Sequence, residues 1–143
     1  MANTQSMCTS FLGELMTATH NFGVAPVRAA TTADTFKAAL YVTTATLNAS
    51  TTAYSSTNEV TGTNYTAGGV SITNATPPSS TNASATAGTG YWTPSASIVY
   101  TNVTLATAFD TVLVYNSTQS NKAVSVHTFG SQTITAGNFT LTM

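Results

Sequence analysis

Residues 34–42 read D-T-F-K-A-A-L-Y-V, and residues 58–72 read N-E-V-T-G-T-N-Y-T-A-G-G-V-S-I. In the first segment, apolar side chains recur at every second position, which is the period of a pleated strand. In the second segment, the pair Gly68-Gly69 precedes another short alternation, which predicts a turn that leads into a strand. These two strands are the starting point for the fold.

The Thr/Ser/Ala-rich loop between these segments contains two large apolar side chains, Leu47 and Tyr54. We expect both of them to attach the loop to the core. Residues 49–56 are also compatible with a single helical turn.

The C-terminal part of the chain is richest in strand patterns. Five candidate strands cover residues 97–105, 110–115, 122–129, 132–135 and 138–143. The second is apolar on both faces and is predicted to lie centrally in the sheet, whereas the third alternates between apolar and polar positions.

The connections between these strands complete the predicted fold. The polar segment 116–121 indicates a hairpin loop, and Ala136-Gly137 predicts a tight turn. Val99, Val103 and Leu105 are expected on one face of their strand. Seven or eight strands without a βαβ pattern predict an all-β fold, namely an antiparallel β-sandwich or jelly roll with a short N-terminal helix or arm.

The composition restricts the classes of function. The 143 residues include 5% charged and 42% hydrophobic residues, with a formal net charge of −1. Roughly a third of the chain is serine or threonine, which gives a neutral, wettable surface. Such a surface provides no electrostatic attraction for nucleic acid or anionic lipid, so we expect neither as a partner. No apolar run is long enough to span a bilayer, and the N-terminus has no secretory signal pattern.

The N-terminal region, residues 1–30, is predicted to be an arm that precedes a single β-sandwich domain at residues 31–143. Residues 10–17 can form a short helix, which Ser10 caps. The apolar positions of this helix are Phe11, Leu12, Leu15 and Met16. Two interpretations remain open: the helix closes one end of the β domain, or it grips a neighbouring subunit.

Residues 73–97 form a low-complexity segment with Pro77-Pro78, which predicts a long exposed loop. Tyr91 and Trp92 stand at its end. A core anchor is the favoured role for this pair, because tryptophan in a small domain usually buries most of its area. The alternative is an exposed aromatic contact, for example with a glycan.

No constellation of catalytic residues is recognisable. The titratable side chains are few and widely spaced, and no nucleophile, phosphate-binding, cofactor-binding or metal-binding motif is present. Asp34 and Asp110 are expected to cap or turn the chain where strands begin. The single cysteine, Cys8, is expected to be a small buried apolar group. We therefore predict that the protein is not an enzyme and uses no cofactor or metal.

Several segments together resemble a family of small structural proteins of tailed bacteriophages and prophages. These are S-F-L-G-E-L (10–15), H-N-F (20–22), F-K-A-A-L-Y (36–41), N-E-V-T-G-T-N-Y-T-A-G-G (58–69), V-Y-N-S (114–117), N-K-A-V-S-V (121–126) and T-A-G-N-F-T-L (135–141). The resemblance covers most of the chain outside residues 73–97, and its motifs are structural.

The resemblance implies a virion component that is made in the host cytoplasm. The expected function is that of a capsid decoration, or cement, protein that binds the major capsid protein and stabilises the shell as a homodimer or homotrimer. The alternative is a tail or fibre component that contacts a host receptor. The expected contact residues are Phe11, Leu12, Leu15, Met16, Leu47, Tyr54, Tyr91 and Trp92.

Overall fold

Two long strands dominate the fold. The computed structural model describes residues 3–16, 19–20, 22, 33–73, 79–80, 90–92 and 94–142. The elements in chain order are β1 (Ser6–Met7), α1 (Thr9–Met16), β2 (Phe36–Val42), β3 (Val70–Ile72), β4 (Ser79–Ser80), β5 (Gly90–Tyr91), β6 (Ile98–Asn116) and β7 (Lys122–Leu141).

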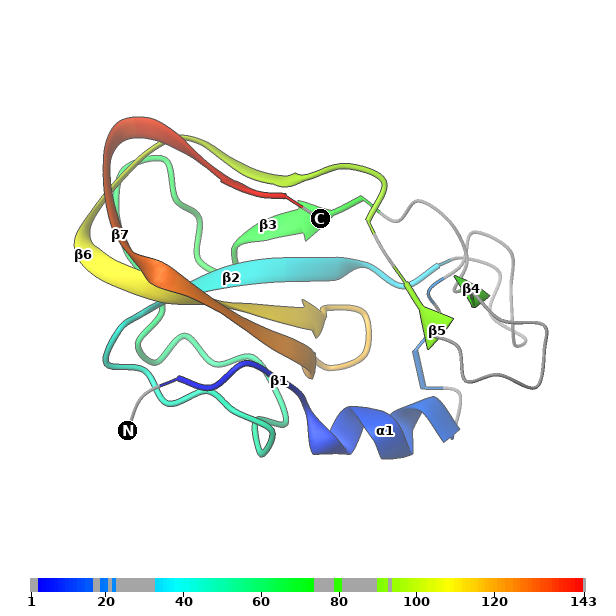
Figure 1. The fold of residues 1–143 in the computed structure, drawn as a ribbon. Helices are drawn as coiled ribbons and strands as arrows, with labels where there is room; N and C mark the ends of the chain where they lie inside the picture. The colour runs from blue at the N-terminus through cyan, green and yellow to red at the C-terminus, as the bar shows by residue number, and fades with distance from the viewer. Residues whose placement is uncertain are drawn as a thin grey trace.

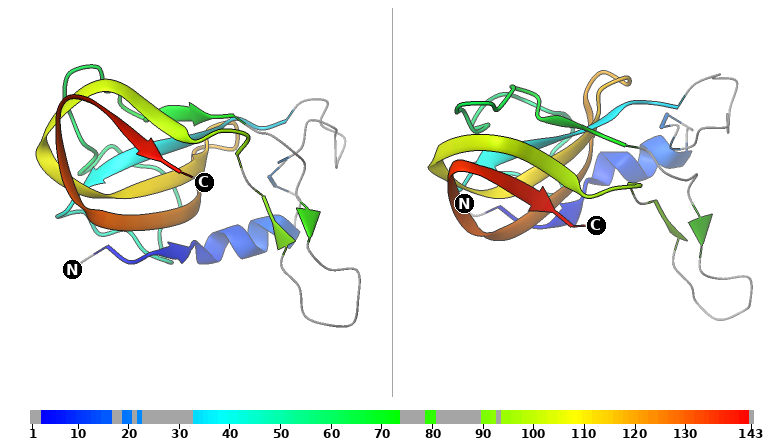
Figure 2. Two further views of the ribbon diagram at one scale, coloured as in Figure 1. Left: turned by 45° about the horizontal axis from the view of Figure 1, so that its top comes forward. Right: turned by 90° about the horizontal axis from the view of Figure 1, so that it is seen from above.

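The main sheet contains five antiparallel strands in the order β1-β7-β6-β2-β3 (Figure 1). β4 and β5 form a separate two-stranded sheet, which stands apart from the main sheet in Figure 2. The prediction of an antiparallel all-β fold with a short N-terminal helix is confirmed.

The β6–β7 hairpin bends back over β2, so that the chain covers β2 from both sides in Figure 1. We call residues 109–116 and 122–128 the inner half of the hairpin. Residues 98–105 and 132–141 are its outer half. The inner half of β6 pairs with β2, and the outer half lies above β2 in the figure.

β-bulges produce this bend, because unequal numbers of residues in paired strands increase local twist and bending. Leu105 pairs with Ile134 and Phe109 with Gln132, so residues 106–108 of β6 face a single residue of β7. Phe109 pairs with Gln132 and Thr111 with Thr128, so residues 129–131 of β7 then face a single residue of β6.

A short segment between β2 and β3 closes the gap between β2 and the outer half. Glu59 forms a bridge with Tyr41 of β2, and Thr63 forms a bridge with Thr104 of β6. The Thr63 and Thr104 backbones exchange two N–H···O bonds of 3.1 Å each. The bent sheet therefore encloses its own core.

The core lies between β2 and the two halves of the hairpin. Its largest fully buried side chains are Tyr41, Tyr100, Phe36, Phe109, Leu40, Leu105 and Leu113. β2 is buried on both faces along most of its length, so the alternation that predicted it does not separate a core face from a solvent face. The hairpin covers the second face, as Figure 1 shows.

Several predicted elements are confirmed. β2 and β3 match the two strands of the opening segments, and the hairpin loop lies at residues 117–121. Residues 110–115 are buried on both faces apart from the partly buried Asp110. Val124 and Val126 are buried, whereas Ser125 and His127 between and after them are only partly buried.

The predicted tight turn at Ala136-Gly137 is wrong. Both residues lie inside β7, and Ala136 has a φ of 47°. Val103 pairs with Gly137 and Leu105 with Ile134, so two residues of β7 face one of β6 at this point. A bulge needs the same permissive residues as a turn, and the local sequence does not distinguish them.

The predicted face of residues 97–105 is also wrong at Val99, which is 40% exposed. Tyr100 points into the core, and a bulge at Asn102, with a φ of 50°, then changes the alternation. Val103 and Leu105 are therefore buried as predicted, but on the same side as Tyr100 rather than Val99.

Three smaller predictions differ from the structure. Ser10 lies inside α1, which begins one residue earlier, so it is not the cap. Residues 49–56 contain turns and an isolated bridge at Ala53 but no helix. Asp110 lies within β6 and does not begin a strand. Most of the predicted loop at 73–97 lies outside the described residues.

Candidate functional site

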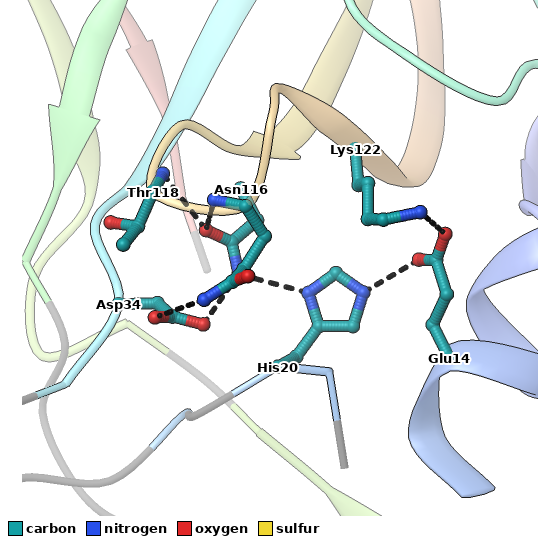
Figure 3. Close-up of polar contacts among 7 residues, drawn as sticks. Glu14, His20, Asp34, Asn116, Thr118 and Lys122 are labelled. Atoms are coloured by element: carbon teal, nitrogen blue, oxygen red, sulfur yellow. Dashed lines mark hydrogen bonds and ion pairs between the residues drawn. The ribbon is translucent and has the colours of Figure 1, made fainter. Parts of the chain in front are cut away.

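A buried polar network joins the N-terminal segment to the end of the β6–β7 hairpin (Figure 3). Glu14 Oε2 lies 2.7 Å from His20 Nε2, and Glu14 Oε1 accepts a 2.6 Å contact from Lys122 Nζ. On the other side of the ring, His20 Nδ1 lies 2.9 Å from Asn116 Nδ2. We call this set, with Asp34, the N-terminal clasp.

Asn116 is fully buried at the centre of the clasp. Its Oδ1 accepts the backbone N–H groups of Thr118 and Gln119, each at 3.1 Å. These two donors fix the orientation of the amide, so Nδ2 must face His20 and Asp34. Nδ2 donates to Asp34 Oδ2 at 2.8 Å, and its second hydrogen is directed to His20.

The fixed amide also determines the tautomer of His20. Because Asn116 Nδ2 is a donor, His20 Nδ1 must be the acceptor, and the ring hydrogen therefore resides on Nε2 and is donated to Glu14. Both ring nitrogens are occupied by protein groups, and His20 is only 5% exposed.

Electrostatics within the clasp favour an ionised Glu14. Burial acts to raise the pKa of this carboxyl group, but hydrogen bonds from Lys122 and His20, together with the charge of Lys122, outweigh it and hold the pKa below its usual value. Burial, with a smaller effect from Glu14, raises the pKa of the nearby Cys8 thiol to about 11. Cys8 is 0% exposed, as predicted for a small buried group.

A second polar network surrounds Glu59, which is 8% exposed. Tyr54 Oη donates to Glu59 Oε2 at 2.7 Å, and Tyr65 Oη donates to Oε1 at 2.8 Å. The backbone N–H of Gly68 also donates to Oε1, at 2.7 Å. Three donors thus satisfy the carboxylate, as a buried charged group requires.

Other tyrosines bind backbone carbonyl groups around the same centre. Tyr100 Oη donates to Ala38 O at 2.8 Å, and Tyr115 Oη donates to Gly68 O at 2.8 Å. Burial is the main cause that raises the pKa of both hydroxyls, and the charge of Glu59 adds to it. These contacts fasten both halves of the hairpin to the β2–β3 region.

The glycine pair of the opening motif is required by this arrangement. Gly68 and Gly69 have φ values of 90° and 70°. A Cβ at Gly69 would lie 1.7 Å from Ala38 O, so only glycine fits where this turn crosses β2.

The polar atoms of both networks are engaged in hydrogen bonds with other groups of the protein. An acid–base catalyst needs a group that can reach a substrate proton, whereas both nitrogens of His20 and both oxygens of Glu59 are directed to protein atoms. Asp110 accepts hydrogen bonds from Asn3 Nδ2 and Thr111 Oγ1 at 2.9 and 2.7 Å. All four acidic residues of the chain are thus hydrogen-bonded within the fold.

The predicted contact residues occupy different environments. Phe11 is 5% exposed, and its ring lies 4.9 Å from the ring of His20 and 5.8 Å from that of Phe22. Leu15, on the same helix, is 44% exposed. The side chains of Leu12 and Met16 lie outside the described residues. Of the described side chains of α1, only Leu15 offers a large apolar group to a partner.

The N-terminal segment is integrated into the β domain. β1 pairs with β7 through Ser6 and Met7, and Cys8 N donates to Val124 O at 3.2 Å. Asn3 further binds Leu47 N through Oδ1 at 3.0 Å. Of the two interpretations left open by the sequence, these contacts favour a helix that closes one end of the β domain over an arm that grips a neighbouring subunit, because the described part of the segment packs on its own domain.

The two predicted loop anchors pack against the core. Leu47 and Tyr54 are both partly buried against it, and the Tyr54 ring stacks on Tyr115 with 4.7 Å between centroids. Beside them lies an open hollow of about 420 Å³ with uncharged walls, including Tyr41, Leu47 and Asn58.

Trp92 also packs against the core, which agrees with its favoured role as an anchor. Its ring lies 5.0 Å from Phe22 and 4.9 Å from Phe36. The side chain of Tyr91 lies outside the described residues.

The surface of the described part carries few charges. Glu14, Lys37, Asp110 and Lys122 are partly buried, with the Lys122 side chain 39% exposed, and Asp34 and Glu59 are buried. Threonine, serine, asparagine and alanine make up most of the exposed positions. Any partner of this surface must therefore bind largely through shape, hydrogen bonds and apolar contacts.

Within the described ranges, no group of three or more His, Cys, Asp or Glu residues could hold a metal ion. In the same ranges, no helix is long and apolar enough to cross a membrane.

Comparisons with protein-family models, curated proteins and solved structures find no match to this chain.

Sequence reasoning missed the partners of Asn116 and Glu59. Both residues lie within the quoted motifs V-Y-N-S and N-E-V. Asn116 contacts His20, which lies 96 residues away, whereas the Glu59 partners Tyr54 and Tyr65 lie only 5 and 6 residues from it. No regular spacing in the sequence predicts these contacts. The sequence feature that could have indicated them is the presence of polar residues directly beside buried strand segments.

Proposed function

We propose that this protein is a capsid decoration protein of a tailed bacteriophage, which binds the major capsid protein as a homo-oligomer and reinforces the shell. The observation that carries the proposal is the resemblance of residues 10–22, 36–69 and 114–141 to small phage structural proteins. A function in adhesion also agrees with acidic residues that are all hydrogen-bonded within the fold.

The sparsely charged surface supports an adhesive mechanism. Each copy would bury modest apolar area and form hydrogen bonds across a junction between capsid subunits, and many copies would reinforce one another. The bent sheet would serve as a compact sandwich- or jelly-roll-like block beneath the contact surface. Because only 5% of the residues are charged, binding to capsids should change little between low and high salt concentration.

The copy number in purified virions tests this function directly. Quantitative mass spectrometry against the major capsid protein should find hundreds of copies in a simple ratio to the capsid subunit. About a dozen copies would instead favour the tail or fibre alternative. Absence from the virion would refute both.

The contact surface can be tested with two matched residues. Leu15 on α1 and Val99 on β6 are 44% and 40% exposed, respectively. Leu15→Asn should weaken binding to purified capsids while Val99→Asn leaves it unchanged, with both variants folded by circular dichroism. Equal binding by the two variants would exclude α1 from the contact.

Deletion of residues 1–16 would not test cleanly whether α1 contacts the capsid. It would remove β1 and Phe11 together with the Glu14 side of the clasp, so lost binding would reflect a damaged domain.

A further inference from the structure

The outer half of β7 is a long strand edge. β7 pairs with β6 along one side, and β1 pairs with its other side only at Val126 and Ser125. Among the described residues, no strand pairs with that side of residues 132–141. Figures 1 and 2 show this strand at the rim of the curled hairpin, away from α1.

The other edges of the main sheet are much shorter. β1 has two residues and β3 has three, which is too short to template extended pairing. The outer half of β7 combines an open side with the length of an ordinary strand, whereas the corresponding side of the outer half of β6 is held at Thr104 by the bridge with Thr63.

Its sequence lacks the residues that usually protect an edge. Residues 128–142 contain no Lys, Arg, Asp, Glu, His or Pro. Natural edge strands are commonly protected by charges, by proline or by bulges. Here the bulges of β7 lie at residues 129–131 and at Ala136, which leaves residues 137–141 of β7 without a bulge of their own.

Apolar side chains along this strand are incompletely covered. Ile134, Phe139 and Leu141 pack against the core but are only partly buried. Phe139 lies 5.1 Å from Phe109 and 6.0 Å from Tyr100 between ring centroids. A partner strand at this edge would extend the sheet and cover apolar area that one copy leaves accessible.

We propose that a second copy of the chain pairs with this edge, antiparallel across a two-fold axis and centred within residues 137–141 of β7. A strand edge is self-complementary in this arrangement, because a two-fold axis brings each donor opposite an acceptor. The absence of charge on the edge means that identical residues meet without repulsion, and the net charge of −1 adds little between copies. This inference specifies the interface of the homo-oligomer in the proposed function, and it is tested on the purified protein without capsids.

Sedimentation of the purified full-length chain tests the proposal. We expect a concentration-dependent dimer. Thr140→Lys places two like charges near the axis and should raise the dimer dissociation constant at least about tenfold. Thr101→Lys is the control, because Thr101 is exposed on the outer half of β6 and not on the β7 edge. Its dimer should be as stable as that of the parent.

A cysteine scan locates the axis. The native Cys8 is 0% exposed, so a single introduced cysteine is the only accessible thiol. Exposed positions of β7 such as Thr133, Thr135 and Thr140 are each replaced and treated with a short bis-maleimide. Cross-linking should peak near the axis and stay at background for Thr101→Cys.

Three outcomes would overturn the proposal. One is a monomer at all concentrations with flat cross-linking across the scan. Another is a dimer that Thr140→Lys and Thr101→Lys affect equally, which would place the interface elsewhere. The third is a monomeric protein that binds capsids and loses that binding only in Thr140→Lys, because the edge would then serve the capsid and not a second copy. Failure of capsid binding alone would count against the proposed function and leave this inference standing.

Discussion

The two halves of the β6–β7 hairpin belong to the same pair of strands but have different surroundings. The inner half is enclosed by β2 on one side and by β1 on the other, and residues 111–116 of β6 are buried without exception. Within the described residues, the two strands of the outer half pair with each other and, through Thr104, with Thr63, and all of the β7 residues 132–141 are exposed or partly buried.

This difference shows that strand pairing and burial are separate properties. Hydrogen bonds within the hairpin are continuous enough to define two long strands, yet the outer half adds only the inward-facing side chains of β6, such as Tyr100 and Leu105, to the fully buried core. The same hairpin therefore supplies a rigid centre and an open edge. Variants that act on one half, or on both, test the distinction.

Alkaline pH should destabilise both halves alike and produce the largest effect. Burial raises the pKa of Tyr41, Tyr54, Tyr65, Tyr100 and Tyr115 above the ordinary value of 10.0. These groups favour the folded state below pH 10, and their contribution is lost as the pH rises above that value, because only the unfolded chain then ionises. Each fully buried tyrosine contributes a slope of about 1.4 kcal/mol per pH unit.

Urea unfolding at pH 9, 10 and 11 measures this effect. Tyr100→Phe removes one hydroxyl, and with it one contribution to the slope. Unchanged stability from pH 9 to 11 would show that the tyrosines are not buried as described.

Large-to-small substitutions should separate the two halves. Leu113 in the inner half is 0% exposed, so Leu113→Ala should lower the free energy of unfolding by about 2–5 kcal/mol. Ile134 in the outer half is partly buried, and Ile134→Ala should cost clearly less. Denaturant midpoints measure both, and equal losses would remove the distinction between the halves.

The N-terminal clasp stabilises the end of the inner half, and its loss should cost less free energy of unfolding than the loss of a core side chain. Asn116→Ala leaves two backbone N–H groups, His20 and Asp34 without this partner, and should cost about 1–3 kcal/mol. A double-mutant cycle with His20→Ala measures the interaction free energy between Asn116 and His20, because the effects of substituting two residues in direct contact are not additive. Additive losses in this cycle would mean that the His20 contact contributes nothing.

Charge on the open edge should have the smallest effect on folding. Thr140 is exposed, so Thr140→Lys should change the unfolding free energy of the monomer by less than about 0.5 kcal/mol. Dilute thermal unfolding of Thr140→Lys beside Thr101→Lys checks this. A large loss would show that Thr140 has a structural role within one copy.

Much of the secondary structure could be predicted because it depends on local pattern. The alternation before Val42, the glycine pair before Val70 and the polar loop after Asn116 each gave an element in the right place. The predictions failed where a bulge replaced a turn or changed a face, at Ala136 and Asn102. Turns and bulges favour the same kinds of residue, namely those that readily adopt a positive φ, and only pairing with the neighbouring strand decides between a turn and a bulge.

The candidate site was less predictable than the fold. Phe11 and Leu15 lie on one short helix, and the sequence treats them alike as apolar arm residues. Their exposures of 5% and 44% depend on which side of α1 meets the domain. The group of tyrosines around Glu59 likewise depends on the bend of the sheet, which brings Tyr65 and Tyr100 together with 6.0 Å between their ring centroids.

The sequence by itself determined an all-β chain with few charges, a short N-terminal helix and no recognisable catalytic motif, because composition and local periodicity are enough for these properties. The tertiary structure decided which side chains of the hairpin became core, which polar residues were buried together and which edge stayed open. These features depend on contacts between residues as distant as His20 and Asn116, and such contacts exist only after the hairpin has bent over β2.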